Sequence, residues 1–290
     1  MKLKERFAGG KLSLSFEVFP PKTTDKYESV KFAAEEIAKL QPSYMSVTYG
    51  AGGGTSAYTV SIASDIQKNF GVTSLAHITC ISSTKDTVRN QLEAIHNAGI
   101  ENILALRGDK PAGVELPPDR DYHYASELIE DIKSYGYDFC IGAACYPEKH
   151  VESENVKEDI KNLKKKVDAG CDFLTTQMFF DNNIFYTFLY KIREAGIYIP
   201  VIPGIMPVTN AKQIIRSCQL SGAELPARFK QIADRFGTDD AAMKQAGIAY
   251  ATEQVIDLFA NGINNVHIYS MNKPDVAAKI FENVSDLLGK

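Results

Sequence analysis

The sequence has few cysteines, and they form no recognisable metal or disulfide motif. The five are odd in number, include no CxxC pair, and stand at Cys80, Cys140, Cys145, Cys171 and Cys218. A disulfide framework or a zinc ribbon would need paired spacings. We therefore expect reduced thiols, as in a cytoplasmic protein.

Long hydrophobic runs are also missing. The longest charge-free apolar stretch, residues 197–208, is about half of the ~20 residues that span a bilayer, and it contains three prolines. The N-terminal segment carries basic residues but no apolar core followed by a cleavage site, so no export signal is visible. These features predict a cytoplasmic protein without membrane contact.

Neither sign of charge dominates. The 32 Lys and Arg residues against 36 Asp and Glu residues leave a net charge of −4, which is mild and of the wrong sign for a general nucleic-acid or anionic-membrane binder. Apolar residues make up 44% and charged residues 23%, which excludes a disordered or fibrous chain. We expect a globular protein that does not bind nucleic acid.

Several site motifs are absent. The sequence has no HExxH, GxSxG or clustered carboxylates, so a catalytic metal is not expected. The glycine-rich segment GAGGGT at residues 50–55 lies where backbone donors can meet a phosphate. It has Thr55 in place of the third glycine of GxGxxG, which disfavours a Rossmann dinucleotide site.

What the sequence does have is a repeated alternation of strand-like and helix-like segments. A length of 290 residues allows two domains or one α/β barrel. Eight runs rich in β-branched and aromatic residues begin near residues 14, 44, 74, 102, 139, 173, 201 and 265. Helical periodicity fills the intervals, and AG endings such as Ala98-Gly99 mark helix C-termini.

This pattern predicts a (β/α)8 TIM barrel over residues 1–290 as one catalytic domain. The interval between the seventh and eighth strands is long and holds a helical region at 226–236 followed by another helix at about 239–260. We therefore expect an extra helix there. No linker rich in Pro, Ser or Gly divides the chain.

Polar residues follow the predicted strands, at the end where such barrels carry their active sites. Glu17 lies inside the apolar run LSFEVF, where a purely structural barrel has little use for an acid. His77 fits a core histidine equally well, and Arg107 and Asp109 can equally pair with helix ends. Gln177 needs partners in its apolar strand.

One face of the helix after the fifth strand groups polar residues. Asp159, Asn162, Lys165 and Lys166 share that face over about two turns. A solvated charged face is the alternative, and it suits Lys157, Lys161 and Lys164. With Tyr146 and His150 close by in the sequence, the group can hold a diphosphate and a ribitol chain.

Nine motifs, in order from about residue 13 to 285, resemble the methylenetetrahydrofolate reductase family: SFEVFPPK, SVTYGAGGGT, AHITC, ALRGD, AACYPEKH, KKKVDAG, TTQMFFD, IPGIMPV and HIYSMNK. The resemblance covers the catalytic domain alone, without the regulatory domain of eukaryotic members. It implies a barrel that binds FAD and reduces 5,10-methylenetetrahydrofolate to 5-methyltetrahydrofolate by ping-pong hydride transfer. The implied donor is NAD(P)H or a protein, and the implied assembly is a homo-oligomer or a complex with an electron-transfer partner.

The resemblance also implies roles for individual residues. Glu17 resembles the general acid, and Asp109 the residue set between flavin and pterin. Gln177, Gln213 and Lys273 match substrate contacts. Positions similar to FAD contacts are Thr48, His77, Arg107, Gly108, Asp109, Tyr124, Ala125, Tyr146, His150, Asp159, Asn162, Lys165 and Lys166.

Three positions depart from the family pattern. Lys165 stands where an Arg is often found, which replaces a forked donor by a point charge. Ser217 replaces a Phe that stacks on the nicotinamide or folate in some members, and Lys273 replaces a frequent Arg. Two other functions stay open: a cofactor-free barrel lyase, for which no predicted strand offers a Schiff-base lysine in its interior, and a non-catalytic or partner-fed flavin subunit of an electron-transfer assembly.

Overall fold

A parallel sheet forms the centre of the computed structural model, which describes residues 1–21, 23–49, 56–110, 113 and 115–290, without the side chains of residues 56, 57, 213, 216 and 220. The nine strand segments are β1 (Ser13–Val18), β2 (Met45–Val47), β3 (Ser74–Thr79), β4 (Asn102–Leu106), β5 (Cys140–Cys145), β6 (Phe173–Thr176), β7 (Val201–Ile202), β8 (Gly204–Ile205) and β9 (Asn265–Tyr269). Each of the eight runs singled out in the sequence overlaps at least one of them.

The sheet closes into a barrel through β7 and β8. The strand order is β7-β6-β5-β4-β3-β2-β1-β9-β8, and every pairing is parallel. Only Pro203 separates β7 from β8, so the two ends of this order are halves of one predicted strand. Pro203 has no N–H to donate, but its carbonyl accepts the N–H of His267 at 2.9 Å. The predicted TIM barrel is confirmed.

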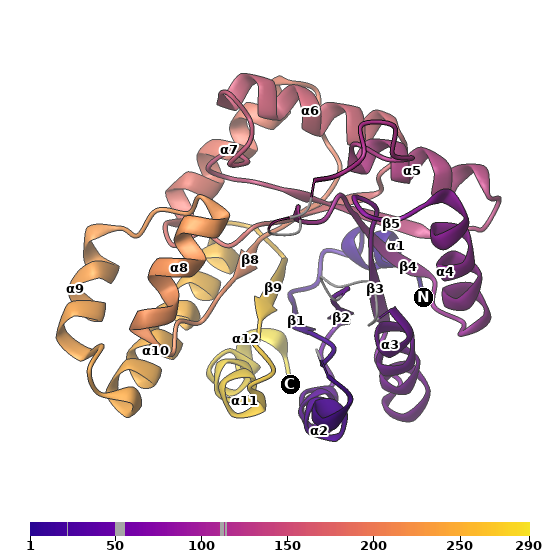
Figure 1. Cartoon of the computed structure of the whole chain (residues 1–290). Coiled ribbons are helices and arrows are strands. Elements are labelled where there is room, and N and C mark those ends of the chain that lie inside the picture. Colours follow the sequence, from indigo (N-terminus) through magenta and orange to yellow (C-terminus); the bar gives the residue numbers. More distant parts are fainter. Residues whose placement is uncertain (22, 50–55, 111–112, 114) are drawn as a thin grey trace.

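Helices cover the outside of the barrel (Figure 1). They are α2 (Tyr27–Ala38), which follows the 3-10 turn η1 (Thr24–Lys26), α3 (Ser56–Phe70), α4 (Lys85–Asn97), α5 (Ala125–Ser134), α6 (Val156–Asp168), α7 (Asn182–Glu194), α10 (Asp240–Ala260), α11 (Pro274–Asn283) and α12 (Ser285–Leu288). Gly99, Gly170 and Gly196 have φ values of +75°, +107° and +77° after α4, α6 and α7, as the AG endings predict. Among the described residues, no helix is long and apolar enough to cross a bilayer.

The interval between β8 and β9 holds three helices rather than the two expected. The predicted extra helix is α9 (Ala227–Phe236), and α8 (Ala211–Ser221) precedes it. Figure 1 shows both in orange, beside α10 at the edge of the barrel. They have an apolar cluster of their own, in which Ile214, Ala223 and Phe229 pack with Met178 and Phe180 from the segment after β6. We call α8, α9 and their connection the insertion.

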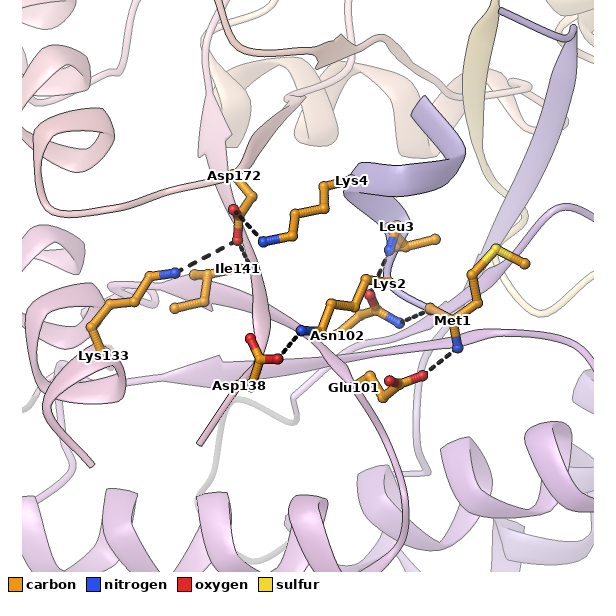
Figure 2. Close-up of polar contacts among 10 residues, drawn as sticks. All are labelled: Met1, Lys2, Leu3, Lys4, Glu101, Asn102, Lys133, Asp138, Ile141 and Asp172. Atoms are coloured by element: carbon orange, nitrogen blue, oxygen red, sulfur yellow. Dashed lines mark hydrogen bonds and ion pairs between the residues drawn. The ribbon is translucent and has the colours of Figure 1, made fainter. Parts of the chain in front are cut away.

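The N-terminal end of the barrel is closed by α1 (Leu3–Phe7). Leu3 and Phe7 pack against Tyr44, Leu104 and Phe173 inside the barrel. Figure 2 shows the polar contacts around this helix, which join it to the loops before β4, β5 and β6. Because α1 fills this end of the barrel, we expect a ligand site at the opposite end, where the strands have their C-termini.

Two side chains carry most of these contacts. The Asn102 Oδ1 accepts the N–H of Leu3 at 2.8 Å. The Asp172 carboxylate accepts the N–H of Ile141 at 2.8 Å and lies 3.4 Å from the Lys4 ammonium and 3.7 Å from that of Lys133 (Figure 2).

Candidate active site

A cavity of about 860 Å³ opens at the C-terminal ends of the strands. Its volume lies within the range of sites for small molecules and cofactors. Two of its lining residues, Glu17 and Gln177, are expected from the sequence to be the acid and a folate contact. The other predicted site residues that line it are Thr48, His77, Arg107, Gly108, Asp109, Tyr124, Ala125, Tyr146, His150, Asp159, Asn162, Lys165 and Lys166.

Glu17 lies in β1, with Ser46 of β2 and Tyr269 of β9 beside it in the sheet register. Its side chain is only 20% exposed, and its Oε2 lies 3.8 Å from Nε2 of His77. Burial raises the pKa of Glu17 to about 8, and a hydrogen bond with Ser46 opposes the rise. At neutral pH the carboxyl group is therefore protonated and able to act as an acid.

Two histidines near Glu17 are neutral. Burial lowers the pKa values of His77 and His267 to about 3. The Nε2 of His77 is buried and has no hydrogen-bond partner among the described residues, which suits a site that receives a polar ligand. An uncharged His77 also leaves the proton on Glu17, because it offers no positive charge to hold a carboxylate.

His267 joins a chain of hydrogen bonds that begins at the acid. Its Nε2 lies 3.0 Å from the Ser46 hydroxyl, and its Nδ1 lies 2.7 Å from the Ser15 hydroxyl. Through Ser46 this chain reaches Glu17. Ser46 and Tyr269 were not among the predicted site residues. The signal for them in the sequence is the alternation of polar and apolar residues along the runs at 13–18, 45–47 and 265–269.

An ion pair between the segments that follow β4 and β5 lines the cavity. The Arg107 guanidinium donates two hydrogen bonds to the Glu152 carboxylate, at 2.5 and 2.8 Å. This hydrogen bonding raises the pKa of Arg107 and lowers that of Glu152. Gly108 follows with φ +88°, and a Cβ there would lie 3.0 Å from the Thr79 Cβ. Asp109 is exposed at the cavity rim.

The predicted face of α6 does line the cavity, but its two lysines differ. The Lys166 Nζ donates to the Ala144 carbonyl at 2.8 Å, and burial lowers the pKa of this lysine. Lys165 is exposed and donates to the Asn162 Oδ1 at 2.8 Å. The Asp159 carboxylate accepts the Ser153 hydroxyl at 2.7 Å. Lys166 is thus the more protected of the two cations.

Aromatic and amide side chains complete the walls. The rings of Tyr146 and His150 meet edge to face with centroids 4.6 Å apart, and burial raises the pKa of Tyr146 to about 12. Tyr124 is exposed at the start of α5, next to the buried Ala125. The Gln177 Oε1 accepts the N–H of Met178 at 2.9 Å, which fixes the orientation of the amide.

Three predictions fall outside this cavity or outside the described residues. Lys273 lies at the start of α11, and its ammonium donates a hydrogen bond to the Thr209 hydroxyl. It does not line the cavity. Gln213 lies in α8, and its side chain is outside the part of the chain that the structure describes. The glycine-rich segment at residues 50–55 lies outside it too. Ser217 is half-buried in α8.

Sequence comparison identifies relatives of this chain. The chain matches the family described as methylenetetrahydrofolate reductase over residues 2–285. The 5,10-methylenetetrahydrofolate reductase of Escherichia coli is 36% identical over 271 residues, which are 93% of this chain and 90% of that protein. Methylenetetrahydrofolate reductase (NADH) 1 of Arabidopsis thaliana is 36% identical over 295 residues, covering 98% of this chain and 50% of that protein. The chain spans about half the length of such plant and fungal relatives.

Structural comparison supports the same fold. A solved structure of an uncharacterized Clostridium thermocellum protein, described as binding two copies of 5-methyl-5,6,7,8-tetrahydrofolic acid, has a TM-score of 0.62 at 13% identity, and the match covers 99% of this chain and 100% of that one. At this identity the likeness concerns the fold alone. The family match and the bacterial relative show that the chain belongs to the methylenetetrahydrofolate reductase family.

Proposed function

We propose that the protein reduces 5,10-methylenetetrahydrofolate to 5-methyltetrahydrofolate with FAD as its cofactor. The observation that carries this proposal is Glu17, an acid with a pKa of about 8 in the wall of a large cavity. The E. coli relative is named for this reaction, and the C. thermocellum structure of the same fold is described as binding its product.

The residues around the cavity fit FAD. The diphosphate needs cations and N–H donors, and Lys166 supplies a partly buried ammonium whose acceptor among the described residues is the Ala144 carbonyl. Gly108 lines the cavity, and its φ of +88° and its close packing against Thr79 suit glycine at this position. The unpartnered Nε2 of His77 is available to a polar cofactor. When bound, FAD would supply hydride transfer from NAD(P)H or a protein donor to the folate.

The protein's own contribution is a proton. The methylene bridge of the folate accepts a hydride readily only after N10 is protonated and the five-membered ring opens to an iminium cation. Glu17 holds this proton near neutral pH because burial disfavours its carboxylate. Asp109 at the rim favours the cation electrostatically, and Gln177 binds the pterin through its oriented amide. We further propose that the protein acts in the cytoplasm, as a homo-oligomer or with an electron-transfer partner.

A half-reaction experiment tests the proposal. The protein is reconstituted with FAD and reduced anaerobically with NADH, NADPH or dithionite, and the flavin absorbance is followed after the folate is added. We expect reoxidation by the folate, with a rate constant that declines as the pH rises through about 8, because Glu17 then loses its proton. Reduction by dithionite alone would indicate a partner-fed flavin subunit, and a protein that cannot bind FAD would favour a cofactor-free lyase.

A further inference from the structure

The loop after β5 contacts the insertion through Glu148. The Oε2 of Glu148 accepts the backbone N–H of Glu224, in the connection between α8 and α9, at 2.7 Å. Its Oε1 is buried and has no hydrogen-bond partner among the described residues. These residues are 76 positions apart in the chain, so the contact joins two separate parts of the fold.

A second contact lies beside the first. Gly222 has φ +76°, and a Cβ built on it would lie 3.0 Å from Cγ1 of Val151 and 3.7 Å from the Lys149 carbonyl oxygen. Lys149 itself has φ +114°, an uncommon conformation for a residue with a side chain. Its ammonium bonds the carbonyl of His150 at 3.1 Å and that of Ser153. The loop is therefore held in one shape against the insertion.

The same loop forms part of the cavity wall. Tyr146 and His150 line the cavity on either side of Glu148, and Glu152 pairs with Arg107. The insertion packs on Met178, which also lines the cavity. Glu148 thus connects the wall assigned to FAD with the helices that include α8.

We propose that Glu148 is a positioning residue that fastens the insertion to the loop after β5 and so holds α8 beside the cavity for folate binding. This inference rests on the proposed function. Glu148 does not line the cavity, so it acts through the position of α8 rather than by touching the substrate.

The charges around Glu148 make this contact sensitive to pH. It faces Glu224 from the α8–α9 connection, Asp181 from the start of α7 and the Cys218 thiol of α8. Burial, with smaller contributions from the carboxylates of Glu224 and Asp181, raises the pKa of Glu148 to about 7, and the hydrogen bond from the Glu224 N–H opposes the rise. If contact with the insertion raises the pKa of the Glu148 carboxyl, the protonated carboxyl favours this contact at low pH. This stabilisation is lost as the pH rises through about 7.

The test compares Glu148→Ala, Glu148→Gln and Gly222→Ala with the unaltered protein loaded with FAD, and with Glu93→Ala, an exposed position on α4, as the control. Hydrogen exchange over residues 219–226 reports the contact without any need for activity. We expect faster exchange in Glu148→Ala and Gly222→Ala, and parental exchange in Glu93→Ala. In the parental protein the protection factor, which is the intrinsic exchange rate at each pH divided by the observed rate, should fall above pH 7. In Glu148→Gln the amide oxygen still accepts the N–H, so the protection factor should stay high and should not fall above pH 7.

Folate kinetics then separate positioning from a purely structural role. Losing one buried hydrogen bond should raise the KM for the folate roughly 3- to 10-fold in Glu148→Ala and leave flavin reduction by the donor unchanged. In the parental protein this KM should rise above pH 7, and in Glu148→Gln it should not.

Two results overturn the proposal. Parental exchange in Glu148→Ala would show that the contact does not hold the insertion. Faster exchange with an unchanged KM and pH profile would show that it serves stability alone. If the parental protein does not act on the folate at all, the proposed function fails, while hydrogen exchange still decides whether Glu148 holds the insertion.

Discussion

Lys166 and Lys165 are neighbours on α6, yet we expect their removal to affect FAD binding differently. Lys166 is partly buried, its ammonium bonds the Ala144 carbonyl at 2.8 Å, and its pKa is lowered by burial. Lys165 is exposed and bonds Asn162. The change is Lys166→Met or Lys165→Met, which in each case keeps an unbranched chain and removes the charge.

The surroundings of each lysine determine the size of the effect. A hydrogen bond from a charged group contributes about 1.5–3 kcal/mol, so Lys166→Met should weaken FAD binding roughly 10- to 150-fold. An exposed ion pair contributes about 0–1 kcal/mol, so Lys165→Met should weaken it at most about 5-fold. High salt should reduce the loss of FAD affinity caused by Lys165→Met, because Lys165 is exposed. It should leave most of the loss caused by Lys166→Met.

The assay is titration of the apoprotein with FAD, followed by flavin fluorescence at low and high salt. Thermal unfolding of each apoprotein is the control, because Lys166→Met also leaves the Ala144 carbonyl without its donor. Equal losses of affinity in the two variants would refute the distinction between them. Unchanged affinity in Lys166→Met would refute the diphosphate assignment itself.

Two further predictions concern stability. A Cβ at Gly247 of α10 would lie 1.8 Å from the Val208 carbonyl oxygen, so Gly247→Ala should lower the free energy of unfolding by about 3 kcal/mol or more. The control is Ala249→Gly on the exposed face of α10, which should lower it by about 1 kcal/mol. Urea unfolding measures both losses, and equal losses would contradict the close packing at Gly247. Asp172→Ala should lower it by about 1–3 kcal/mol by leaving the N–H of Ile141 unpaired, whereas Asp172→Asn, which keeps an acceptor, should lose less; a larger loss in Asp172→Asn would show that charge dominates.

Local sequence patterns predict most of the barrel because each unit carries its own signals. Runs of β-branched residues locate the strands, and glycines such as Gly99 and Gly170 end the helices in left-handed geometry. The division at Pro203 follows from closure of the sheet, since β7 pairs with β6 and β8 with β9. The helix α8 was not predicted, because its apolar face packs against Met178 and Phe180, which are distant in sequence.

The candidate site shows the same limit. Glu17 stands out in the sequence as an acid in an apolar strand. The register between β1 and β2, which the sequence does not show, places Ser46 beside it. His267 lies opposite Ser15 only because β9, the last strand of the chain, pairs with β1, the first. The partner of Arg107 is Glu152, 45 residues away in another loop. Such contacts depend on the closed fold rather than on any local pattern.

In the proposed reaction Glu17 supplies the proton for folate reduction, and stopped-flow absorbance of the Glu17→Gln variant tests this role. The amide keeps the shape of the side chain but has no proton to release. We predict that reduction of the flavin by the donor stays near the parental rate, and that reoxidation by methylenetetrahydrofolate falls roughly 10²- to 10⁴-fold. Equal slowing of both steps would point to a distorted flavin site. Reoxidation at the parental rate would contradict the assignment of Glu17 as the acid.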